Sequence, residues 1–409
     1  MTKKSFVGLS VGSSKIRAIV AENGAKEKTT IVGVFEAPSY GFKKGKVVDF
    51  NEVVQSVGRV LSEIRNAYKP ALRHIILGIP SVDFKMHRSR GSVAVGRADL
   101  EIGENDVLRV LEAARAVNIP HNRVLVHTLT REFIVDGVGD IADPLGMIGG
   151  KLEVDSFIVD LFAPTIKSLT KAVEMAGGHV GSVVFEPLAI ARSLLSKNQK
   201  ELGSMSLDIG FGLTTLSVFE EGKLLHMGVV PVGSSHITND IAIGLKSSID
   251  LAEKMKTGFG HAMAKEVSSR AAIDLLKIDE QMKGQVSQKF IIDIIEARLT
   301  EILDFVHNEL KTIGKAGGLP AGVVLSGGGA KLPGLVDLIK RELRLPAQVG
   351  VPDTSAFLIN DSMLQDELTD PECAAVVGLM LCNEDIEEPY SAMSSYKNWW
   401  RRILNIFIP

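Results

Sequence analysis

The sequence has 409 residues, enough for two to four domains and a sizeable hydrophobic core. Hydrophobic residues make up 45% and charged residues 23%, the balance of an ordinary soluble globular protein. The net charge of −3 argues against general nucleic-acid binding, and no apolar run approaches the roughly 20 residues of a spanning helix.

The N-terminus and the cysteines indicate a cellular location. The chain begins with a short polar run that carries lysines, so we expect no signal peptide. Cys373 and Cys382 lie in one apolar stretch, too far apart along a helix to bond, and are interpreted as core thiols. We therefore expect a cytosolic protein, and the spacing of the nine histidines suggests no metal ligand among them.

The first predicted element is a β-hairpin over residues 7–20, VGLSVGSSKIRAIV, in which apolar residues alternate on both sides of a turn that contains Gly12. Helical spacing of apolar residues predicts a helix over residues 51–68, with Asn51 as its N-cap. A buried strand is expected over residues 75–79.

The next block has no copy elsewhere in the chain. Within it we predict a strand over residues 89–95, a helix over 103–118, and two further strands over 124–126 and 133–135. A turn-rich stretch, DPLGMIGGKLEV, leads into another strand. We interpret residues 81–162 as an inserted α+β subdomain, within the usual size of a small module.

Glu186 is predicted to lie where a strand over residues 180–186 meets a helix over 187–196. At such a corner the carboxylate could orient a water molecule towards a bound phosphate. The alternative is a carboxylate that the dipole of the following helix favours at its N-terminus.

A second hairpin, SLDIGFGLTTLSVF, begins at Ser206 and repeats the first, with Leu207 in the place of Leu9 and Gly210 in the place of Gly12. Two copies of one hairpin suggest a duplicated domain with a cleft between the halves. Asp208 stands just before the glycine turn, where a carboxylate beside backbone N–H groups suits a magnesium ion and a phosphate tail.

Further helices are expected over residues 234–245, 248–256 and 286–313. On the second of these, Glu253 and Lys256 lie three residues apart, a spacing that usually gives a solvated ion pair.

Residues 323–329, VVLSGGG, predict a buried strand and a triple-glycine turn, followed by a helix over 335–343 and a last core helix over 371–381. The corresponding strand of the first half lacks the glycines. Only the second half would therefore admit a ribose or base against its backbone.

The chain ends with an acidic linker, residues 383–396, and the segment KNWWRRILNIFIP, residues 397–409. On a helix, one arc would carry Trp399, Trp400, Ile403, Leu404 and Phe407, and the other Arg401 and Arg402. This arrangement favours the headgroup region of a bilayer, and the alternative is a helix that docks on its own domain or a partner.

Taken together, these residues resemble the FtsA family, actin-like bacterial proteins that tether the tubulin-like FtsZ to the membrane. The resemblance covers nearly the whole chain, including VGLSVGSSKI, LVHTLTREFIVDG, DPLGMIGGKLEV, VVFEPLAIA, SLDIGFGLTTL, AEKMK, VVLSGGGAKLPGL and ECAAVVGL. The inserted subdomain is its most specific part, because actin, DnaK-like chaperones and sugar kinases share the duplicated core without that insert.

The resemblance implies an α/β, actin-like duplicated fold in which the inserted subdomain replaces the usual actin subdomain 1B. The implied parts are 1–80 and 163–202 (subdomain 1A), 81–162 (1C, SHS2-like), 203–233 and 315–382 (2A), 234–314 (2B), the linker 383–396 and the membrane-targeting helix 397–409. It also implies head-to-tail filaments on the cytoplasmic face of the membrane at the division site, and contacts of the insert with later divisome proteins.

ATP and Mg²⁺ are the implied cofactors. The resemblance assigns Asp208 to the magnesium and Arg298, on the long helix, to the FtsZ C-terminal tail. Glu186, from its place at the corner, is the candidate for the positioning of water. The nucleotide-binding residues that the resemblance implies are Gly12, Ser13, Ser14, Lys15, Asp208, Gly210, Gly212, Thr214, Glu253, Lys256, Gly327, Gly328 and Gly329.

Two departures from the family pattern concern hydrolysis. Ser10 stands where the family usually has an acidic residue, and Phe211, Leu213 and Thr215 change the usual DIGGGTTD. We expect ATP binding to survive through backbone donors and Asp208, with at most slow ATPase activity.

Two alternatives stay open, one within the same fold and one from a different functional class. A PilM-type pilus-assembly protein has a related insert but needs no amphipathic anchor of its own. An ATP-dependent small-molecule phosphotransferase needs a catalytic base facing its substrate, and beyond Glu186 no stretch offers one.

Overall fold

The computed structural model describes residues 4–23, 28–278 and 284–382. Within these ranges, no helix combines the length and the apolar character needed to cross a membrane. The predicted linker and the predicted amphipathic helix, with all seven of its membrane-contact residues, lie outside the described residues.

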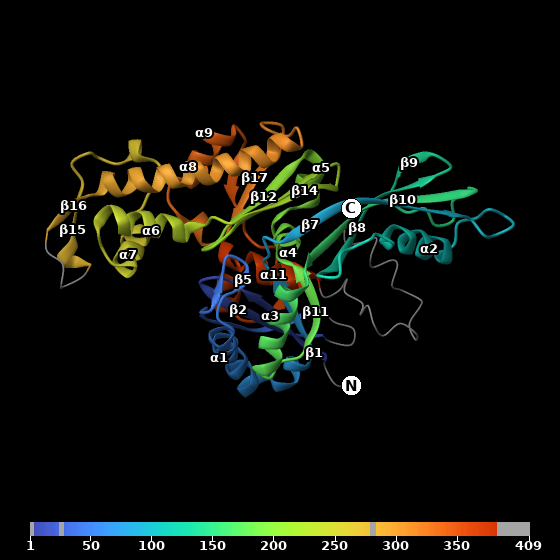
Figure 1. The fold of residues 1–409 in the computed structure, drawn as a ribbon, viewed down its shortest axis with the longest axis horizontal. Helices are drawn as coiled ribbons and strands as arrows, with labels where there is room; N and C mark the ends of the chain where they lie inside the picture. Colours follow the sequence, from blue (N-terminus) through green and yellow to red (C-terminus); the bar gives the residue numbers. More distant parts are fainter. Residues whose placement is uncertain (1–3, 24–27, 279–283, 383–409) are drawn as a thin grey trace.

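The first half of the chain forms a six-stranded sheet in the order β11-β6-β1-β2-β3-β19, with helices on both faces (Figure 1). Strand β1 runs antiparallel to β2 and parallel to β6. Because both faces are covered, β6 and the centre of β1 are apolar, and Val7, Leu9 and Ile76 are fully buried. The elements of this half are β1 (Lys4–Val11), β2 (Lys15–Asn23), β3 (Thr30–Pro38), β4 (Phe42–Lys43), β5 (Lys46–Val47), α1 (Phe50–Tyr68), η1 (Lys69–Arg73), β6 (Ile75–Ile79), α3 (Ala163–Met175), β11 (Val180–Phe185), α4 (Glu186–Leu194) and α5 (Lys197–Leu202).

The second half repeats this architecture in a five-stranded sheet, β14-β13-β12-β17-β18. In each half, three consecutive strands form an antiparallel meander. The first of them also pairs with a parallel strand, and a second parallel strand follows that one in the sheet. The duplicated fold is therefore confirmed. The elements are β12 (Ser204–Ile209), β13 (Thr214–Glu220), β14 (Lys223–Val230), α6 (Ser234–Leu245), α7 (Ile249–Phe259), η2 (Ala264–Glu266), β15 (Ala272–Asp274), η3 (Leu275–Lys277), β16 (Gln285–Ser287), α8 (Gln288–Thr312), β17 (Gly322–Ser326), η4 (Gly328–Lys331), α9 (Leu335–Leu343) and β18 (Ala347–Val349).

The C-terminal elements return to the first half, which corrects the predicted assignment of 315–382 to the second half alone. These elements are β19 (Leu358–Ile359), α10 (Ser362–Leu368), η5 (Pro371–Cys373) and α11 (Ala374–Cys382). Strand β19 pairs with β3, and α11 packs on β1 and α4. The contact is so close that a Cβ on Gly8 would lie 2.7 Å from the sulfur of Met380.

The insert forms a separate four-stranded antiparallel sheet, β7-β10-β8-β9, and extends away from the second half's α6 and α7 (Figure 1). Helix α2 covers one face and shares a small core with it, including Val107, Val110, Phe133 and Leu152. Its elements are β7 (Phe84–Ala94), α2 (Glu104–Arg115), β8 (Arg123–Val135), β9 (Val138–Ile141) and β10 (Lys151–Phe162).

Two local predictions were wrong. Residues 124–126 and 133–135 belong to one strand, β8, which pairs with β10 along its length and absorbs two bulges, so the polar run between them does not break it. Helix α1 is capped by Asp49, whose side chain accepts a 3.0 Å hydrogen bond from the N–H of Glu52, and not by Asn51, which lies inside the helix.

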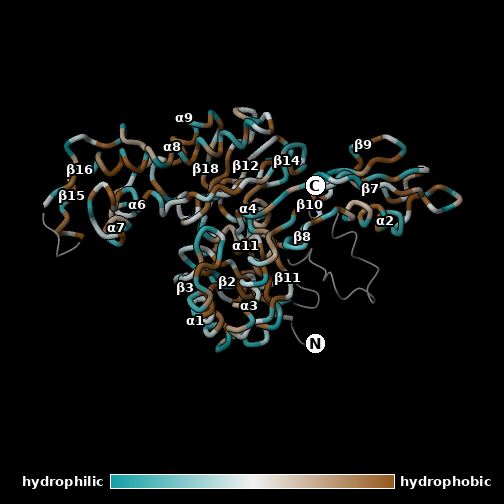
Figure 2. The backbone as a smooth tube through the Cα atoms, in the orientation of Figure 1, coloured by the Kyte–Doolittle hydropathy of each residue, from teal (hydrophilic) through white to brown (hydrophobic). Residues whose placement is uncertain are grey.

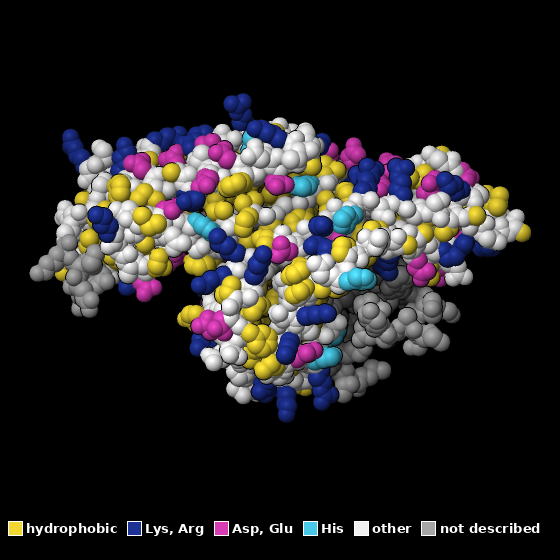
Figure 3. All heavy atoms as spheres, in the orientation of Figure 1, with side chains coloured by type: hydrophobic (Ala, Val, Ile, Leu, Met, Phe, Trp, Pro, Cys, Tyr) yellow, Lys and Arg dark blue, Asp and Glu magenta, His cyan; other side chains and the backbone are white. Residues whose placement is uncertain are grey.

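Hydropathy follows this architecture: hydrophobic positions gather along the central strands of the two halves (Figure 2). On the face drawn in Figure 3, Lys and Arg side chains are interspersed with Asp and Glu, as the small net charge of the sequence would suggest.

Candidate functional site

The two glycine turns, one from each half, meet between the sheets. A Cβ on Gly212 would lie 2.7 Å from Oγ of Ser13, so only glycine allows the second turn this close to the first. Ser13 Oγ in turn accepts a 3.2 Å hydrogen bond from the N–H of Lys44. The structure therefore brings together the two turns that the sequence predicted to grip phosphates.

Helix α6 orients the second turn. The first N–H groups of this helix, from Ser234 and Ser235, donate 2.9 Å hydrogen bonds to the carbonyls of Gly210 and Phe211. The N–H groups of Phe211 and Gly212 donate no hydrogen bond within the described part of the chain. With the carbonyls occupied by the helix, the free amides form a cradle suited to an anion.

Asp208 lies at the end of β12, beside the triple-glycine turn. Its Oδ1 accepts a 2.8 Å hydrogen bond from Ser326 Oγ of β17. Burial and the charge of Glu372 raise the pKa of Asp208 to about 6, although the Ser326 bond opposes the rise. Among the described residues, no group of three or more His, Cys, Asp or Glu could hold a metal ion. A magnesium ion at Asp208 would therefore need further oxygen ligands, such as those of phosphates.

Glu186 is the first residue of α4 and almost fully buried, 6% exposed. Its Oε1 accepts a 2.7 Å hydrogen bond from Ser10 Oγ of β1. Burial raises the pKa of Glu186 to about 8, and the charge of Asp208 adds to the rise while the Ser10 bond opposes it. At neutral pH this carboxyl is mostly protonated, so it is a poor acceptor for a proton from water.

The three glycines after β17 differ in whether a larger residue could take their place. Gly327 has a φ of 79°, and a Cβ there would lie 2.7 Å from the carbonyl oxygen of Ile209. A Cβ on Gly329 would lie 2.6 Å from the Ile209 side chain. Gly328 is exposed, with its nearest heavy-atom neighbour 3.6 Å from a Cβ there. Two of the glycines thus seat the turn on β12, whereas a Cβ at the third would make only an ordinary van der Waals contact with Glu372.

Glu253 and Lys256 form an ion pair of 2.7 Å on α7, but it is not the solvated pair that the spacing suggests. Lys256 is 8% exposed, and its Nζ also donates to Thr238 Oγ1 at 2.9 Å and lies 5.9 Å from the ring centroid of Phe211. The pair therefore lies next to the second glycine turn.

Three predicted residues are engaged elsewhere. Lys15 pairs with Glu36 at 3.1 Å and with Glu372 at 3.8 Å, and the hydroxyl of Thr214 donates to the carbonyl of Val232 at 2.9 Å. Arg298 lies on α8, where Asp240 of α6 and Glu301 bind its guanidinium.

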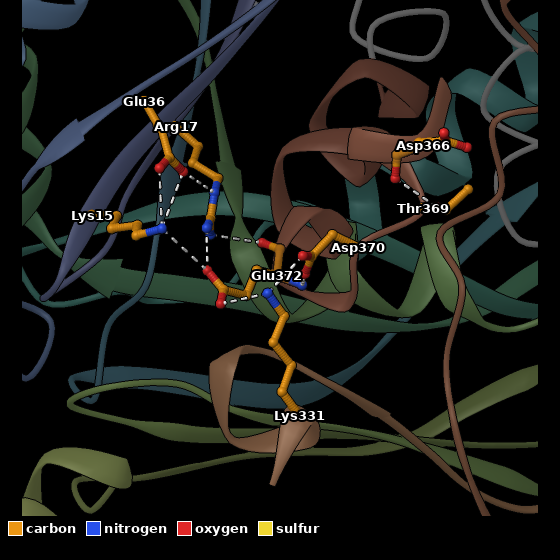
Figure 4. Close-up of polar contacts among 8 residues, drawn as sticks. All are labelled: Lys15, Arg17, Glu36, Lys331, Asp366, Thr369, Asp370 and Glu372. Carbon is orange, nitrogen blue, oxygen red and sulfur yellow. Dashed lines mark hydrogen bonds and ion pairs between the residues drawn. The ribbon is translucent and has the colours of Figure 1, made fainter. Parts of the chain in front are cut away.

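A cluster of charges beside the triple-glycine turn was not predicted from the sequence (Figure 4). Glu372 lies 2.9 Å from Lys331 Nζ and also pairs with Arg17, while Asp370 lies 2.6 Å from Lys331. Lys15 and Arg17, two apart on β2, share a face of the strand, a signal that could have pointed to a paired acid. Nothing local to Glu372 indicates its partners.

The chain resembles known proteins over most of its length. A family model described as cell division protein FtsA matches residues 205–378, and one described as an SHS2 domain inserted in FTSA matches residues 82–160. Cell division protein FtsA of Bacillus subtilis is 36% identical over 348 residues, 85% of this chain and 79% of that protein. The FtsA of Pseudomonas aeruginosa is 32% identical over 378 residues, 92% of this chain and 89% of that protein.

Solved structures share the fold. A structure of the PilM–PilN type IV pilus biogenesis complex superimposes with a TM-score of 0.66 at 18% identity, covering 92% of this chain and 97% of that chain. MreB5 of Spiroplasma citri bound to ADP gives a TM-score of 0.53 at 11% identity, covering 93% and 96%. The fold is therefore actin-like, with an SHS2 domain inserted in its first half.

Proposed function

The chain belongs to the FtsA family of cell-division proteins, and on this premise we propose that it is an ATP-binding membrane tether for FtsZ. In this proposal it polymerises on the cytoplasmic face of the membrane at the division site, holds FtsZ there and helps to recruit later divisome proteins. The observation that carries it is the identity to FtsA proteins across both halves and the insert.

Nucleotide binding is supported by the geometry between the two halves. The ATP phosphates would lie against the Gly12–Lys15 and Gly210–Thr214 turns, where the N–H groups of Phe211 and Gly212 are free, and Asp208 would hold the Mg²⁺. Glu253 and Lys256 would approach the ribose and base, and the exposed Gly328, with its two neighbouring glycines, would face the adenosine. Structures of MreB5 bound to ADP and to AMPPNP have the same fold, which supports the binding of a nucleotide.

Hydrolysis would be slow at most. Glu186, the candidate for positioning water, is protonated at neutral pH and bound to Ser10, so it neither accepts a proton readily nor turns freely towards the phosphates. Phe211, in place of the usual family glycine, stiffens the turn that would have to close around the γ-phosphate.

The protein–protein contacts follow from the family. The FtsZ tail would bind subdomain 2B near α8 and Arg298, and the insert would contact the next subunit of a filament or later division proteins. A PilM-like role rests on a likeness that shows the fold alone, at 18% identity.

Membrane attachment would come from residues 397–409, which carry both tryptophans of the chain. A helix over residues 397–408 would be about 18 Å long, too short for a hydrocarbon core of roughly 30 Å, and would lie in the interface. Arg401 and Arg402 would each contribute about 1 kcal/mol towards anionic headgroups. Because one such helix binds reversibly, polymerisation would strengthen attachment through avidity.

Co-sedimentation with anionic liposomes, with and without FtsZ, tests the proposal. The full chain should pellet with liposomes and carry FtsZ with it. Deletion of residues 398–409, or Trp400→Glu, should abolish pelleting and leave ATP binding intact, whereas Asn405→Gln on the polar arc should change nothing. If the deleted protein still pellets with liposomes, the tail is not the anchor; if FtsZ stays in the supernatant throughout, the tethering role is wrong.

A further inference from the structure

The corner between β11 and α4, where Phe185 precedes Glu186, is held by the insert. Strand β11 is the edge of the first-half sheet, so one side of its backbone has no neighbouring strand. The N–H of Phe185 donates a 2.9 Å hydrogen bond to Nε2 of His127, on β8 of the insert. The ring of Phe185 also packs on Phe84 of β7, with 5.0 Å between the ring centroids.

His127 acts here as a permanent acceptor. Burial lowers the pKa of its imidazole to about 4, so the ring is neutral throughout the physiological range. Since Nε2 accepts the proton of the Phe185 amide, the ring proton is on Nδ1. An unpaired amide at this position would be costly, because Phe185 is fully buried.

The two residues that follow contact both halves of the fold. Glu186 accepts its hydrogen bond from Ser10 of β1, and Gly78 of β6 makes room for it, since a Cβ there would lie 2.6 Å from Oε1. The carbonyl of Pro187 accepts a 3.1 Å hydrogen bond from Ser217 Oγ of β13, in the second half. One corner therefore joins the insert, the first half and the second half.

The insert also has a direct attachment to the second half. Lys223, at the start of β14, lies 2.6 Å from Oδ1 of Asp140 and 3.3 Å from Oε2 of Glu132, both in the insert. The insert is therefore bonded both to the second half, through Lys223, and to the corner at Phe185, through His127.

We propose that His127 is a positioning residue that couples the insert to the nucleotide site, by fixing the backbone at Phe185 from which Glu186 reaches Ser10. The coupling rests on the proposed binding of ATP between the halves. Such coupling is reciprocal by thermodynamic necessity. If ATP changes the affinity of the insert for a partner by some factor, that partner changes the affinity of the nucleotide site for ATP by the same factor.

Hydrogen exchange measured by mass spectrometry on the full chain, with and without MgATP, tests this coupling. Without ATP, the amide of Phe185 should exchange about tenfold faster in His127→Ala than in the parent protein, because one hydrogen bond is lost. His127→Gln should restore slow exchange, since its amide oxygen can accept the same bond. His121→Ala, at an exposed histidine of the insert, is the matched control and should change nothing.

The response to ATP separates coupling from a purely structural role. In the parent protein and in His127→Gln, MgATP should slow exchange both in residues 180–190 and in residues 123–130 of the insert. In His127→Ala the first response should remain and the second should disappear.

If residues 123–130 still respond to ATP in His127→Ala, or do not respond in the parent protein while residues 180–190 do, the coupling is refuted and ATP binding stands. If calorimetry shows no binding of ATP to the parent protein, the proposed nucleotide function fails and the coupling fails with it. An unchanged Phe185 amide in His127→Ala without ATP refutes the role of the hydrogen bond in either case.

Discussion

Lys331 and Glu372 form an ion pair that links the second half of the fold to the first, with 2.9 Å between Nζ and Oε1. On the other side of the same carboxylate, Arg17 of β2 donates a hydrogen bond to Oε2 and another, of 3.1 Å, to the backbone carbonyl of Glu372. Burial alone would raise the pKa of Glu372, but the bonds from Arg17 and Lys331 outweigh it and lower the pKa to about 2. Glu372 therefore stays ionised wherever the protein is folded at ordinary pH.

This low pKa predicts how stability depends on Glu372. A carboxyl group whose pKa falls on folding stabilises the folded state above its unfolded pKa of about 4.3, and this contribution is lost as the pH falls towards 2. Glu372→Gln should lower the free energy of unfolding by about 3 kcal/mol at pH 7, from roughly 1.4 kcal/mol per pKa unit. In urea titrations the difference from the parent protein should shrink between pH 5 and pH 3.

The matched control is Glu367→Gln, at an exposed glutamate on α10. This substitution should change the free energy of unfolding little at any pH, because exposed charges contribute little to stability. A loss in Glu372→Gln that is the same at pH 7 and pH 3 would contradict the role of its ionised carboxylate.

Glu186 predicts the opposite dependence. Its pKa of about 8 in the folded protein lies above the unfolded value, so the unfolded state binds fewer protons between about pH 4.3 and pH 8, and stability falls across that range. Glu186→Gln removes this loss. The stability of the variant relative to the parent should rise by a few kcal/mol from pH 4.5 to pH 8 and then level off.

Thermal unfolding of the two proteins at several pH values measures this effect. The size of the change at one pH also contains the altered bond with Ser10, so the slope with pH is the informative quantity. If the difference in stability between the parent protein and Glu186→Gln does not change between pH 4.5 and pH 8, Glu186 is ionised in the folded protein.

Local patterns in the sequence predicted the long elements well. Strand β6 and helices α6 and α9 have the predicted bounds, because a continuous apolar run or helically spaced apolar residues extend to their ends. Short elements were missed. Strand β19 has two residues, and pairing with Thr30 and Ile31 of β3 makes it a strand, a relation that no local pattern carries.

The parts of the candidate site formed by residues close together in the chain could be predicted, and the parts formed by contacts between distant residues could not. Glycines at fixed spacing and one aspartate mark the two turns, so Asp208 and Gly212 could be predicted from their neighbours in the chain. Arg17 and Glu372 are separated by most of the sequence, and their pairing depends on the return of the C-terminal elements to the first half. The same return makes Lys331 and Glu372 a link between the halves.

Asp208 predicts a magnesium-dependent part of ATP affinity. Asp208→Asn removes a charge and should weaken MgATP binding at pH 7.5 by about tenfold, while ATP measured with a chelator should bind nearly as before. In the parent protein the contribution of magnesium should fade as the pH drops below about 6, because Asp208 becomes protonated.

Titration calorimetry at pH 7.5 and pH 5.5 gives all of these affinities. Asp366→Asn, at an exposed aspartate on α10, is the control for a change in net charge. If Asp208→Asn loses the same affinity for ATP with and without magnesium, Asp208 stabilises the glycine turn and does not bind the metal.

Arg298 is held by a partner within the protein, and this gives a sharp test of the proposed FtsZ-tail site. Its Nε lies 2.6 Å from Oδ2 of Asp240, and its Nη2 donates to Oδ1 at 3.0 Å, so a carboxylate of an incoming peptide would have to replace Asp240. If Arg298 contacts the tail, Arg298→Ala should weaken binding of an FtsZ tail peptide by about tenfold. Asp240→Asn should strengthen binding or leave it unchanged, because it frees the guanidinium.

Fluorescence anisotropy with a labelled tail peptide distinguishes direct contact from support of the two helices. If the bidentate pair only fixes α6 against α8, both variants should weaken binding to the same extent and both should lower the melting temperature. Arg270→Ala, at an exposed arginine of the same subdomain, controls for the loss of one positive charge. Unchanged affinity in Arg298→Ala would remove this side chain from the site, since a buried charge-assisted contact cannot be deleted without cost.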